Sequence, residues 1–188
     1  MKKGLGVIVG VVVVILLLVV SLGSSYNSMV KLSENVDSKY ADISVQLKRR
    51  TDLIPNLINT VKGYMDHEQK IIDSITEART NLVNAKTVSE QAKANDELSS
   101  ALNSLNVIVE NYPDLKSNTN FIQLQDELAG TENRIAVSRK DYNDAVKDYN
   151  STIKSFPKNI IAGMFGFDEK DYFEITNADK EVPNVSFD

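Results

Sequence analysis

Residues 121–156 read FIQLQDELAGTENRIAVSRKDYNDAVKDYNSTIKSF, and bulky apolar side chains recur there at every seventh position. These side chains are Phe121, Leu128, Ile135, Tyr142, Tyr149 and Phe156. At about 1.5 Å per residue, the spacing defines one stripe along a helix of about 54 Å. The positions three residues further on are mostly smaller, namely Leu124, Thr131, Ser138, Ala145 and Thr152. Large side chains opposite small ones predict close helix packing, as in the coiled-coil-like seam of a bundle.

A second stripe with the same spacing occupies residues 26–64. One row contains Tyr26, Ser33, Tyr40, Leu47, Ile54 and Val61, and the row offset by three contains Met29, Val36, Ile43, Arg50, Leu57 and Tyr64. Only Ser33 and Arg50 interrupt the apolar pattern. We therefore predict a second long helix over residues 25–62, capped at its C-terminal end by Gly63.

Two shorter helices are predicted between the long ones. Asp66 and Gln69 have the spacing of a cap pair, and they precede an apolar face made of Ile71, Ile75, Ala78, Leu82 and Ala85. Thr87 and Glu90 form a better capping box, and the helix after it carries Leu98, Leu102, Leu105 and either Ile108 or Val109. Pro113 and its polar neighbours in NYPDLKSN (111–118) indicate a turn.

The predicted fold class is all-α, because no convincing strand precedes residue 170. Residues 24–157 are expected to form an elongated antiparallel four-helix bundle, in which the two long helices flank each other. Residues 158–188 are expected to form a short C-terminal tail that is apolar at first and irregular afterwards.

The N-terminal region differs in character from the rest. Residues 5–22 contain no charged side chain, and as a helix they would extend about 27 Å, close to the hydrocarbon thickness of a bilayer. This run is longer than the apolar part of a usual signal peptide, so residues 1–23 are expected to be a retained single-pass transmembrane helix, a signal-anchor. The small residues of SLGSS (21–25) leave a cleaved signal peptide as the alternative.

The charges around this span predict its orientation. Lys2 and Lys3 precede it, whereas the first lysines beyond it are accompanied by Glu34 and Asp37. The positive-inside rule therefore favours a short cytoplasmic stub and a bundle on the extracytoplasmic side of the bacterial inner membrane.

Composition excludes several classes of partner and chemistry. Without Lys2 and Lys3 the chain has 19 basic and 26 acidic residues, a net charge of −7, which repels nucleic acid. The chain contains no cysteine, so disulfides, thiolate metal ligands and lipidation at a lipobox are excluded.

The sequence shows no motif that would carry catalysis. His67 is the only histidine, and a di-iron bundle would need Glu-x-x-His pairs, whereas Tyr64 stands three residues before it. Zinc motifs, glycine-rich phosphate loops and nucleophile elbows are also absent. We expect a non-enzymatic protein with no catalytic, cofactor-binding or metal-binding residues.

Pro55 lies inside the first long helix, in the stretch RRTDLIPNLINTVKGY (49–64). Proline lacks a backbone N–H and its ring clashes with the carbonyl four residues earlier. We therefore expect a kink near Thr51 or Asp52, which would also free a carbonyl for another partner.

Arg50 lies on the predicted seam, where an unpaired charge would be costly. If the last helix runs antiparallel with Phe156 beside Tyr26, the numbers of paired residues sum to about 182, and Arg50 faces Glu132. We predict a buried or half-buried Arg50–Glu132 pair that specifies the register of the helices more than it adds stability.

The segment FPKNIIAGMFGF (156–167) is apolar and is expected near the membrane surface, where the last helix of the bundle ends. Ile160, Ile161, Met164, Phe165 and Phe167 are available for burial. Ile160, Ile161 and Met164 are expected to share one helical face. Two interpretations stay open, because these side chains could contact lipid or could cover the open base of the bundle.

Three segments resemble the LemA family of bacterial membrane proteins. They are RRTDLIPNLINTVKGYMDHE (49–68), ENYPDLKSNTNFIQLQDELAGTENRIAVSRKDYNDAVKDYNSTIKSFPKNIIAGMFGF (110–167) and VPNVSF (182–187), with Met65, Ala129 and Ser138 as mild departures. With the N-terminal anchor they run across nearly the whole chain. The resemblance implies a single-pass anchor carrying a helical bundle, with no settled enzymatic activity, cofactor or substrate. A relative among magnetosome-membrane proteins implies, by analogy, a membrane-organising role.

The expected function is to scaffold protein or membrane assemblies in the bacterial envelope. The expected partners are the lipid bilayer, further copies of the chain through polar flanking faces, and unidentified membrane or envelope proteins. One alternative is an envelope sensor or ligand-binding bundle, which a pocket lined by polar side chains would favour. Another is an accessory subunit of a membrane enzyme or protease, which a stable co-purifying partner would favour.

Overall fold

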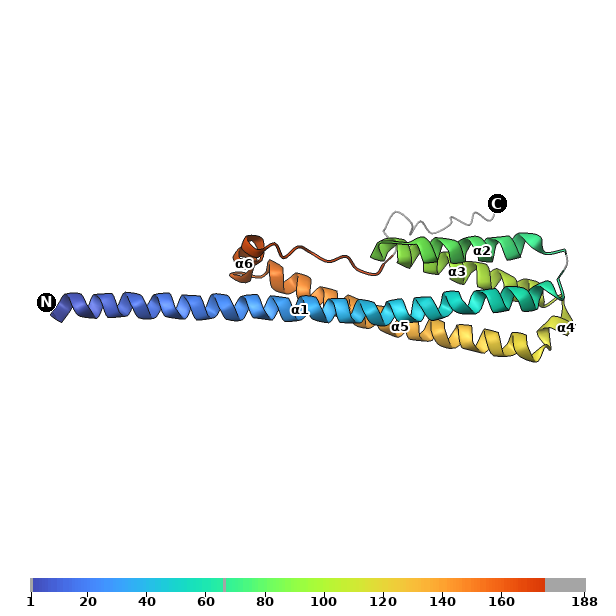
Figure 1. The fold of residues 1–188 in the computed structure, drawn as a ribbon, viewed down its shortest axis with the longest axis horizontal. Coiled ribbons are helices and arrows are strands. Elements are labelled where there is room, and N and C mark those ends of the chain that lie inside the picture. Colours follow the sequence, from blue (N-terminus) through green and yellow to red (C-terminus); the bar gives the residue numbers. More distant parts are fainter. Residues whose placement is uncertain (1, 66, 175–188) are drawn as a thin grey trace, which may run out of the picture. The chain divides into compact units, whose positions relative to one another are not determined.

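The computed structural model describes residues 2–65 and 67–174 (Figure 1). This part of the chain is all-helical and contains no strand, which confirms the predicted class. Its helices are α1 (Lys2–Lys62), α2 (Gln69–Asn84), α3 (Val88–Val109), α4 (Pro113–Lys116), α5 (Thr119–Lys154) and α6 (Lys158–Phe165).

The chain divides into two compact units. The first unit consists of Met1–Lys39 and Asp144–Lys170, and the second of Tyr40–Asn143 and Asp171–Asp188. Helices α1 and α5 contribute residues to both units, α2, α3 and α4 belong to the second, and α6 belongs to the first. Each unit buries its own set of apolar side chains.

Helix α1 is a single helix of 61 residues, so the predicted start at residue 25 is wrong. The small residues at 23–25 include no proline, and every residue there can donate to the backbone four residues earlier. The helix therefore continues directly from the apolar run into the predicted seam. The C-terminal end at Lys62 agrees with the prediction.

The cap expected at Gly63 has a different form. Among the described residues only Gly166 has a positive φ, 72°, so Gly63 is not a left-handed cap. The amides of Tyr64 and Met65 instead donate to the Val61 carbonyl at 3.0 and 3.1 Å. The Val61 carbonyl in the last turn of α1 thus accepts hydrogen bonds from the two residues that follow Gly63.

The core of the second unit is built from apolar stripes on α1, α2, α3 and α5. Helices α2 and α3 lie side by side as a hairpin (Figure 1). The buried residues of these stripes include Ile43, Ile54 and Leu57 of α1, Ile71, Ile75 and Leu82 of α2, Leu98, Leu102 and Leu105 of α3, and Phe121, Leu128 and Ile135 of α5. Burial stabilises the fold by about 1.5–3 kcal/mol for each such side chain.

The two predicted helix starts in the hairpin have different outcomes. At α3 the capping box is confirmed, because the Glu90 amide donates to Thr87 Oγ1 at 3.1 Å and the Thr87 amide donates to Glu90 Oε2 at 3.0 Å. At α2 the N-cap is Glu68, with no side-chain cap bond, and Asp66 lies outside the described residues. The predicted Asp66–Gln69 cap pair thus lies partly outside the described residues, and the helix itself begins at Gln69.

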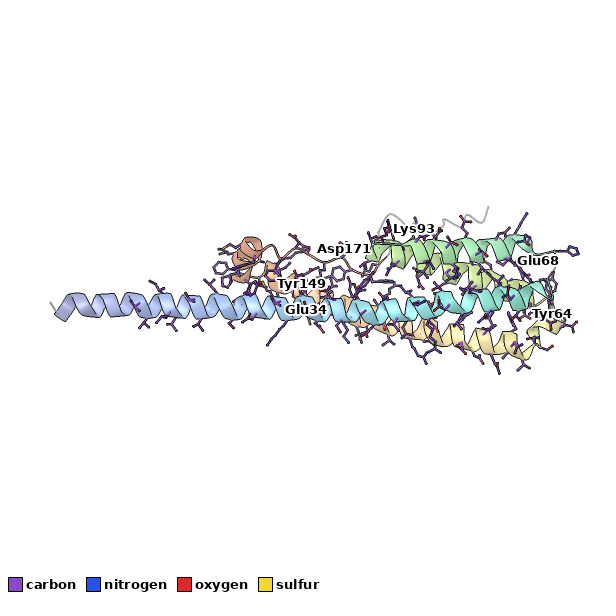
Figure 2. The ribbon with its side chains drawn as sticks, in the orientation of Figure 1. Glu34, Tyr64, Glu68, Lys93, Tyr149 and Asp171 are labelled. Carbon is purple, nitrogen blue, oxygen red and sulfur yellow. The ribbon has the colours of Figure 1, made fainter. Side chains whose placement is uncertain are left out.

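The turn after α3 contains the one-turn helix α4. Pro113 occupies its first position, where its missing N–H costs no hydrogen bond. Tyr64 and Glu68 lie at the same end of the second unit (Figure 2). Tyr112 Oη donates to Glu68 Oε1 at 3.1 Å, and Asn118 Nδ2 donates to Tyr64 Oη at 2.9 Å. Burial, the bond to Glu68 and its negative charge raise the pKa of Tyr112, so this hydroxyl stays protonated.

Helix α5 carries the stripe from which the fold was predicted. Phe121, Leu128, Ile135, Tyr142 and Tyr149 are all buried. Phe156 is 81% exposed, so its predicted place in the seam is wrong. Helix α5 ends at Lys154, two residues earlier, because Pro157 disfavours a helical conformation in the residue before it.

The core of the first unit is smaller. It buries Met29 and Val36 of α1, Val146 and Ile153 of α5, and Ile161 and Ala162 of α6. Helix α6 ends at Phe165 and is capped by Gly166, whose φ of 72° suits a residue without a side chain. The Phe167 amide then donates to the Ala162 carbonyl at 3.0 Å.

Candidate functional site

Arg50 is the centre of a polar cluster in the core of the second unit. It is 3% exposed, and its Nη1 lies 2.5 Å from both Asn95 Oδ1 on α3 and Glu132 Oε2 on α5. The pairing of Arg50 with Glu132 that the helix register predicts is thus present in the structure. Asn95, which is 1% exposed, was not predicted.

The Arg50–Glu132 pair is half-buried rather than buried. The Glu132 side chain is 43% exposed, and its Oε1 accepts a bond from Ser99 Oγ at 3.5 Å. Burial lowers the pKa of the Arg50 guanidinium, whereas the negative charges of Glu132 and Asp96 oppose that change. Because one face of the pair reaches water, part of the desolvation cost of an ion pair is avoided.

A second polar contact forms at the carbonyl that Pro55 leaves without a backbone donor. Helix α1 stays helical on both sides of Pro55, and the Thr51 carbonyl accepts a bond from Arg79 Nε of α2 at 2.9 Å. Proline 55 therefore frees a carbonyl for a neighbouring helix, as expected. The structure uses this carbonyl to connect α1 with α2.

Replacing Arg79 by methionine is expected to cost about 1–2 kcal/mol of unfolding free energy, because a half-buried carbonyl loses its donor. The cost should nearly vanish in the Pro55→Ala background, since the amide of an alanine at 55 can donate to the Thr51 carbonyl. Urea unfolding of the two single variants and the double variant measures this coupling. Equal costs of the Arg79 change in both backgrounds would contradict it.

The apolar side chains of α6 divide between two environments. Ile161 is 4% exposed, whereas Ile160 is 55% and Met164 75% exposed, so the expectation that these three share one face is wrong. At 100° per residue, Ile160 and Met164 align with each other and Ile161 points elsewhere. Phe165 is 58% exposed, and Phe167 is half-buried.

The aromatic rings of this segment lie beside Tyr26 of α1. The ring centroids of Phe165 and Phe167 lie 5.0 and 5.5 Å from that of Tyr26, within the range of favourable aromatic pairs. Tyr26 follows the end of the apolar run at Leu22 by about 6 Å of helix. The aromatic end of α6 therefore lies next to the end of that run.

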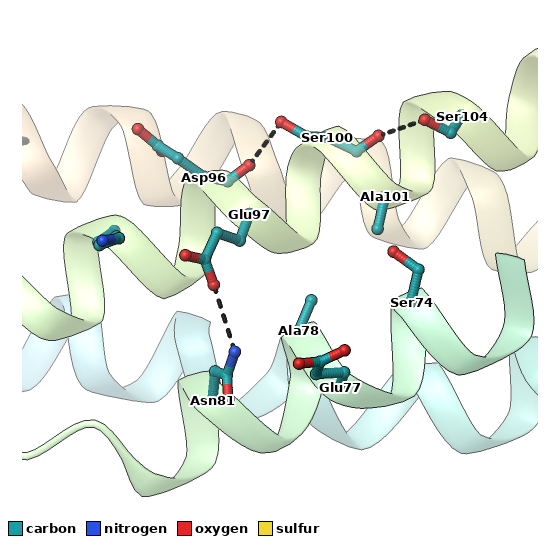
Figure 3. A pocket seen from close by; sticks show the side chains of 10 residues that line it. Ser74, Glu77, Ala78, Asn81, Asp96, Glu97, Ser100, Ala101 and Ser104 are labelled. Carbon is teal, nitrogen blue, oxygen red and sulfur yellow. Dashed lines mark hydrogen bonds between the residues drawn. The ribbon is translucent and has the colours of Figure 1, made fainter. Parts of the chain in front are cut away.

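A polar groove of about 630 Å³ runs between α2 and α3 (Figure 3). Its carboxylates come from Glu77, Asp96 and Glu97, and Asn81 Nδ2 donates to Glu97 Oε2 at 3.4 Å. Two of its serines, Ser100 and Ser104, donate to carbonyls of their own helix. The arrangement can hold water or a polar ligand, and it offers no nucleophile paired with a base.

The described part of the chain does not bring His67 or the carboxylates together into a metal-binding site. His67 is exposed, and in the described part of the chain no three histidine or carboxylate side chains gather as metal ligands would. The residues that sequence reasoning missed are Asn95, Arg79 and the polar side chains that hold residues 167–174. The position of Asn95 on the buried face of α3 could have been inferred from the sequence, since Asn95 lies three residues before Leu98, where the apolar stripe begins.

Helix α1 is, in the described part of the chain, the helix that is long and apolar enough to cross a membrane, and almost none of its apolar window is buried. The described part of the chain is thus an all-helical protein with one candidate membrane span.

Residues 39–187 match the LemA family, which is most of the chain. The protein belongs to the LemA family.

Its relatives include two magnetosome proteins and a protein named LemA. It is 27% identical over 175 residues to magnetosome protein MamQ 2 of Paramagnetospirillum magneticum, covering 79% of this chain and 64% of that protein. It is 24% identical over 174 residues to magnetosome protein MamQ of Magnetospirillum gryphiswaldense, with the same coverage of 79% and 64%. It is 26% identical over 139 residues to protein LemA of Metamycoplasma hominis, covering 72% of this chain and 63% of that one. The chain thus spans slightly under two thirds of the length of these relatives.

Proposed function

We propose that this protein is a non-enzymatic, single-pass membrane protein that scaffolds protein or membrane assemblies in the bacterial envelope. Residues 1–23 serve as the anchor, residues 24–157 as an antiparallel four-helix bundle, and residues 158–188 as the tail. The bundle stands on the extracytoplasmic side of the inner membrane. Its partners are lipid, further copies of the chain and other envelope proteins.

The observation that carries the proposal is the divided apolar surface of α6. One face packs in the first unit through Ile161 and Ala162, while Ile160 and Met164 on the same short helix remain exposed and Phe165 lies beside Tyr26, just after the apolar run. A soluble domain gains nothing from exposing these side chains, whereas the interfacial region of a bilayer can bury them. The protein then contacts the membrane at α1 and again at α6, as a scaffold fixed on a membrane surface requires.

Two features of the second unit support a structural role. Its helices are connected by the Arg50, Glu132 and Asn95 cluster and by the Arg79 contact to Thr51. Polar contacts of this kind select one alignment of the helices, because a shift by one turn leaves buried charges without partners. The names of the relatives agree with this role, since two of them are magnetosome proteins.

We expect the full-length chain to self-associate. Confinement of every copy to the membrane plane raises its effective concentration, so weak polar contacts between copies suffice. Mass photometry in mild detergent should resolve dimers or larger species whose share grows with protein concentration. Monomers alone at every concentration would contradict self-association.

A second candidate function is that of a ligand-binding bundle in the envelope. The observation that favours it is the polar groove between α2 and α3, whose lining includes Lys93 as well as carboxylates and serines. A ligand there would be small and polar. Thermal stabilisation of the protein by a panel of polar metabolites, absent from a Glu97→Leu variant, would support this function over scaffolding.

A further inference from the structure

Helix α5 contains an internal repeat that the seam does not explain. The tetrapeptide Lys-Asp-Tyr-Asn occurs at residues 140–143 and again at residues 147–150. Tyr142 and Tyr149 belong to the apolar stripe, but the asparagines that follow them do not. In each repeat the tyrosine and the asparagine bind the backbone of residues 167–174, a segment without helix or strand that we call the strap.

The repeat at 147–150 binds the strap within the first unit. Tyr149 Oη donates to the Asp168 carbonyl at 2.9 Å (Figure 2). Asn150 binds the Lys170 backbone twice, because its Nδ2 donates to the carbonyl at 2.8 Å and its Oδ1 accepts from the amide at 2.9 Å. Tyr149 is 2% and Asn150 5% exposed, so these are buried polar groups with fixed partners. Burial and the charges of Asp168 and Asp37 raise the pKa of Tyr149, which keeps its hydroxyl a donor.

The repeat at 140–143 binds the strap in the same way within the second unit. Tyr142 Oη donates to the Asp171 carbonyl at 2.8 Å. Asn143 Oδ1 accepts from the Phe173 amide at 2.8 Å, and its Nδ2 donates to the Phe173 carbonyl at 3.4 Å. In both repeats the tyrosine binds one residue of the strap and the asparagine binds the residue two further on.

The spacing of the two repeats suits an extended peptide. Seven residues of helix rise about 10.5 Å, and three residues of extended chain span about 10 Å. The bonds to the strap recur with the corresponding period of three, since the tyrosines bind residues 168 and 171 and the asparagines bind residues 170 and 173. Because these two lengths nearly agree, two tetrapeptides seven residues apart on the helix can bind positions three residues apart on the strap with the same contacts.

Two strap side chains add selectivity to this backbone binding. Lys170 Nζ lies 2.6 Å from Asp37 Oδ1 and 5.6 Å from the centroid of the Tyr149 ring. Phe173 is 0% exposed, with the Arg139 guanidinium 5.9 Å from its ring centroid. The segments that fit are therefore of the form Lys-x-x-Phe, because Asp168 and Asp171 are bound only through their backbone carbonyls.

We propose that the two tetrapeptide repeats of α5 form a binding site for extended Lys-x-x-Phe segments, through which copies of this chain exchange straps. The bonds to the strap are made by backbone atoms, so an identical strap from a second copy makes every one of them. Exchange conserves the contacts and costs mainly the entropy of association, which confinement in a membrane reduces. This inference rests on the proposed self-association and assigns its contact.

Chains with one cysteine each can test the exchange, because the natural chain has none. Lys154 on α5 and Glu169 on the strap form an ion pair at 2.7 Å, and both side chains are 59% exposed. Replacing them removes an exposed pair of little value to stability. The full-length variants K154C and E169C, carrying different tags, are expressed together in one membrane and treated with a short bismaleimide. A chain with both cysteines is treated in parallel.

The double variant should cross-link within one chain, and the co-expressed single variants should give a cross-linked dimer carrying both tags. Adding Asn143→Ala and Asn150→Ala to the K154C chain should lower the dimer yield about tenfold or more, because several buried bonds to the strap are lost. Circular dichroism of that chain checks that its helices remain. A D148C chain is the matched control, since Asp148 lies about 120° around α5 from Lys154 and should give little dimer.

The proposal is overturned if the double variant cross-links internally while the co-expressed pair never forms the mixed dimer. It is also overturned if the double variant does not cross-link, or if the mixed dimer is unaffected by loss of the asparagines. Oligomers in mass photometry without the mixed dimer would leave self-association in place and exclude strap exchange as its contact. Monomers alone in mass photometry would contradict both self-association and strap exchange.

Discussion

Replacing Arg50 by glutamate is expected to reduce the unfolding free energy of the second unit by about 3–5 kcal/mol. The change places a negative charge in the core, at a position where the natural Arg50 is 3% exposed. The new carboxylate would lie beside that of Glu132 and near that of Asp96. It also takes from Asn95 Oδ1 the donor that now lies 2.5 Å away. Urea unfolding followed by helical circular dichroism measures the loss.

Adding Glu132→Arg to this variant should recover part of the loss, because the pair is restored with its charges exchanged. Arg50→Met is the matched control, since it keeps most of the side-chain volume without adding a charge. It should cost less than Arg50→Glu because Glu132 is 43% exposed and water can solvate its free carboxylate. A coupling energy near zero between the two charge reversals would mean that the helices are aligned differently.

Replacing Phe173 by alanine is expected to release the strap from the second unit. Phe173 is 0% exposed, and loss of such a ring typically costs about 3–5 kcal/mol. We expect the loss to appear as local opening rather than as a lower melting temperature, because the apolar stripes of the four helices in this unit are buried on residues outside the strap. We expect limited proteolysis within residues 167–174 to become faster by about a hundredfold or more.

Tyr172→Ala is the control for this prediction, since that neighbouring side chain is 39% exposed. It should leave the cleavage rate nearly unchanged. A large fall in melting temperature on loss of the Phe173 ring would instead mean that the strap is part of the cooperative core.

Much of the helical fold could be predicted because its apolar spacing is regular. The period of seven in residues 121–149 identifies α5, and the same period places Arg50 opposite Glu132 once the helices are assumed antiparallel. The capping box at Thr87 was visible because its partners lie three residues apart in the sequence. These features depend on local geometry, which a sequence shows directly.

The features that could not be predicted depend on contacts between segments far apart in the chain. The division of α6 into a buried Ile161 and an exposed Ile160 depends on which face meets the first unit, and the apolar run alone fits several faces. The role of Asn150 depends on its two bonds to the Lys170 backbone, a contact between residues 20 positions apart that local spacing does not show. The tetrapeptide repeat was readable, but only its bound strap shows that the repeat binds a peptide.

The most direct test of the central claim is whether α6 contacts lipid. The chain contains no tryptophan, so one introduced at Met164, which is 75% exposed, reports that face alone. Tryptophan at Leu17 in the apolar run is the positive control, and tryptophan at the exposed Gln123 of the second unit is the negative control. The full-length variants are placed in vesicles whose lipids carry bromine near the headgroup or deeper in the acyl chain. A membrane protein with a second lipid contact predicts quenching at position 164 by the shallow bromines, quenching at 17 and none at 123. Quenching at 17 without any at 164 would contradict the account.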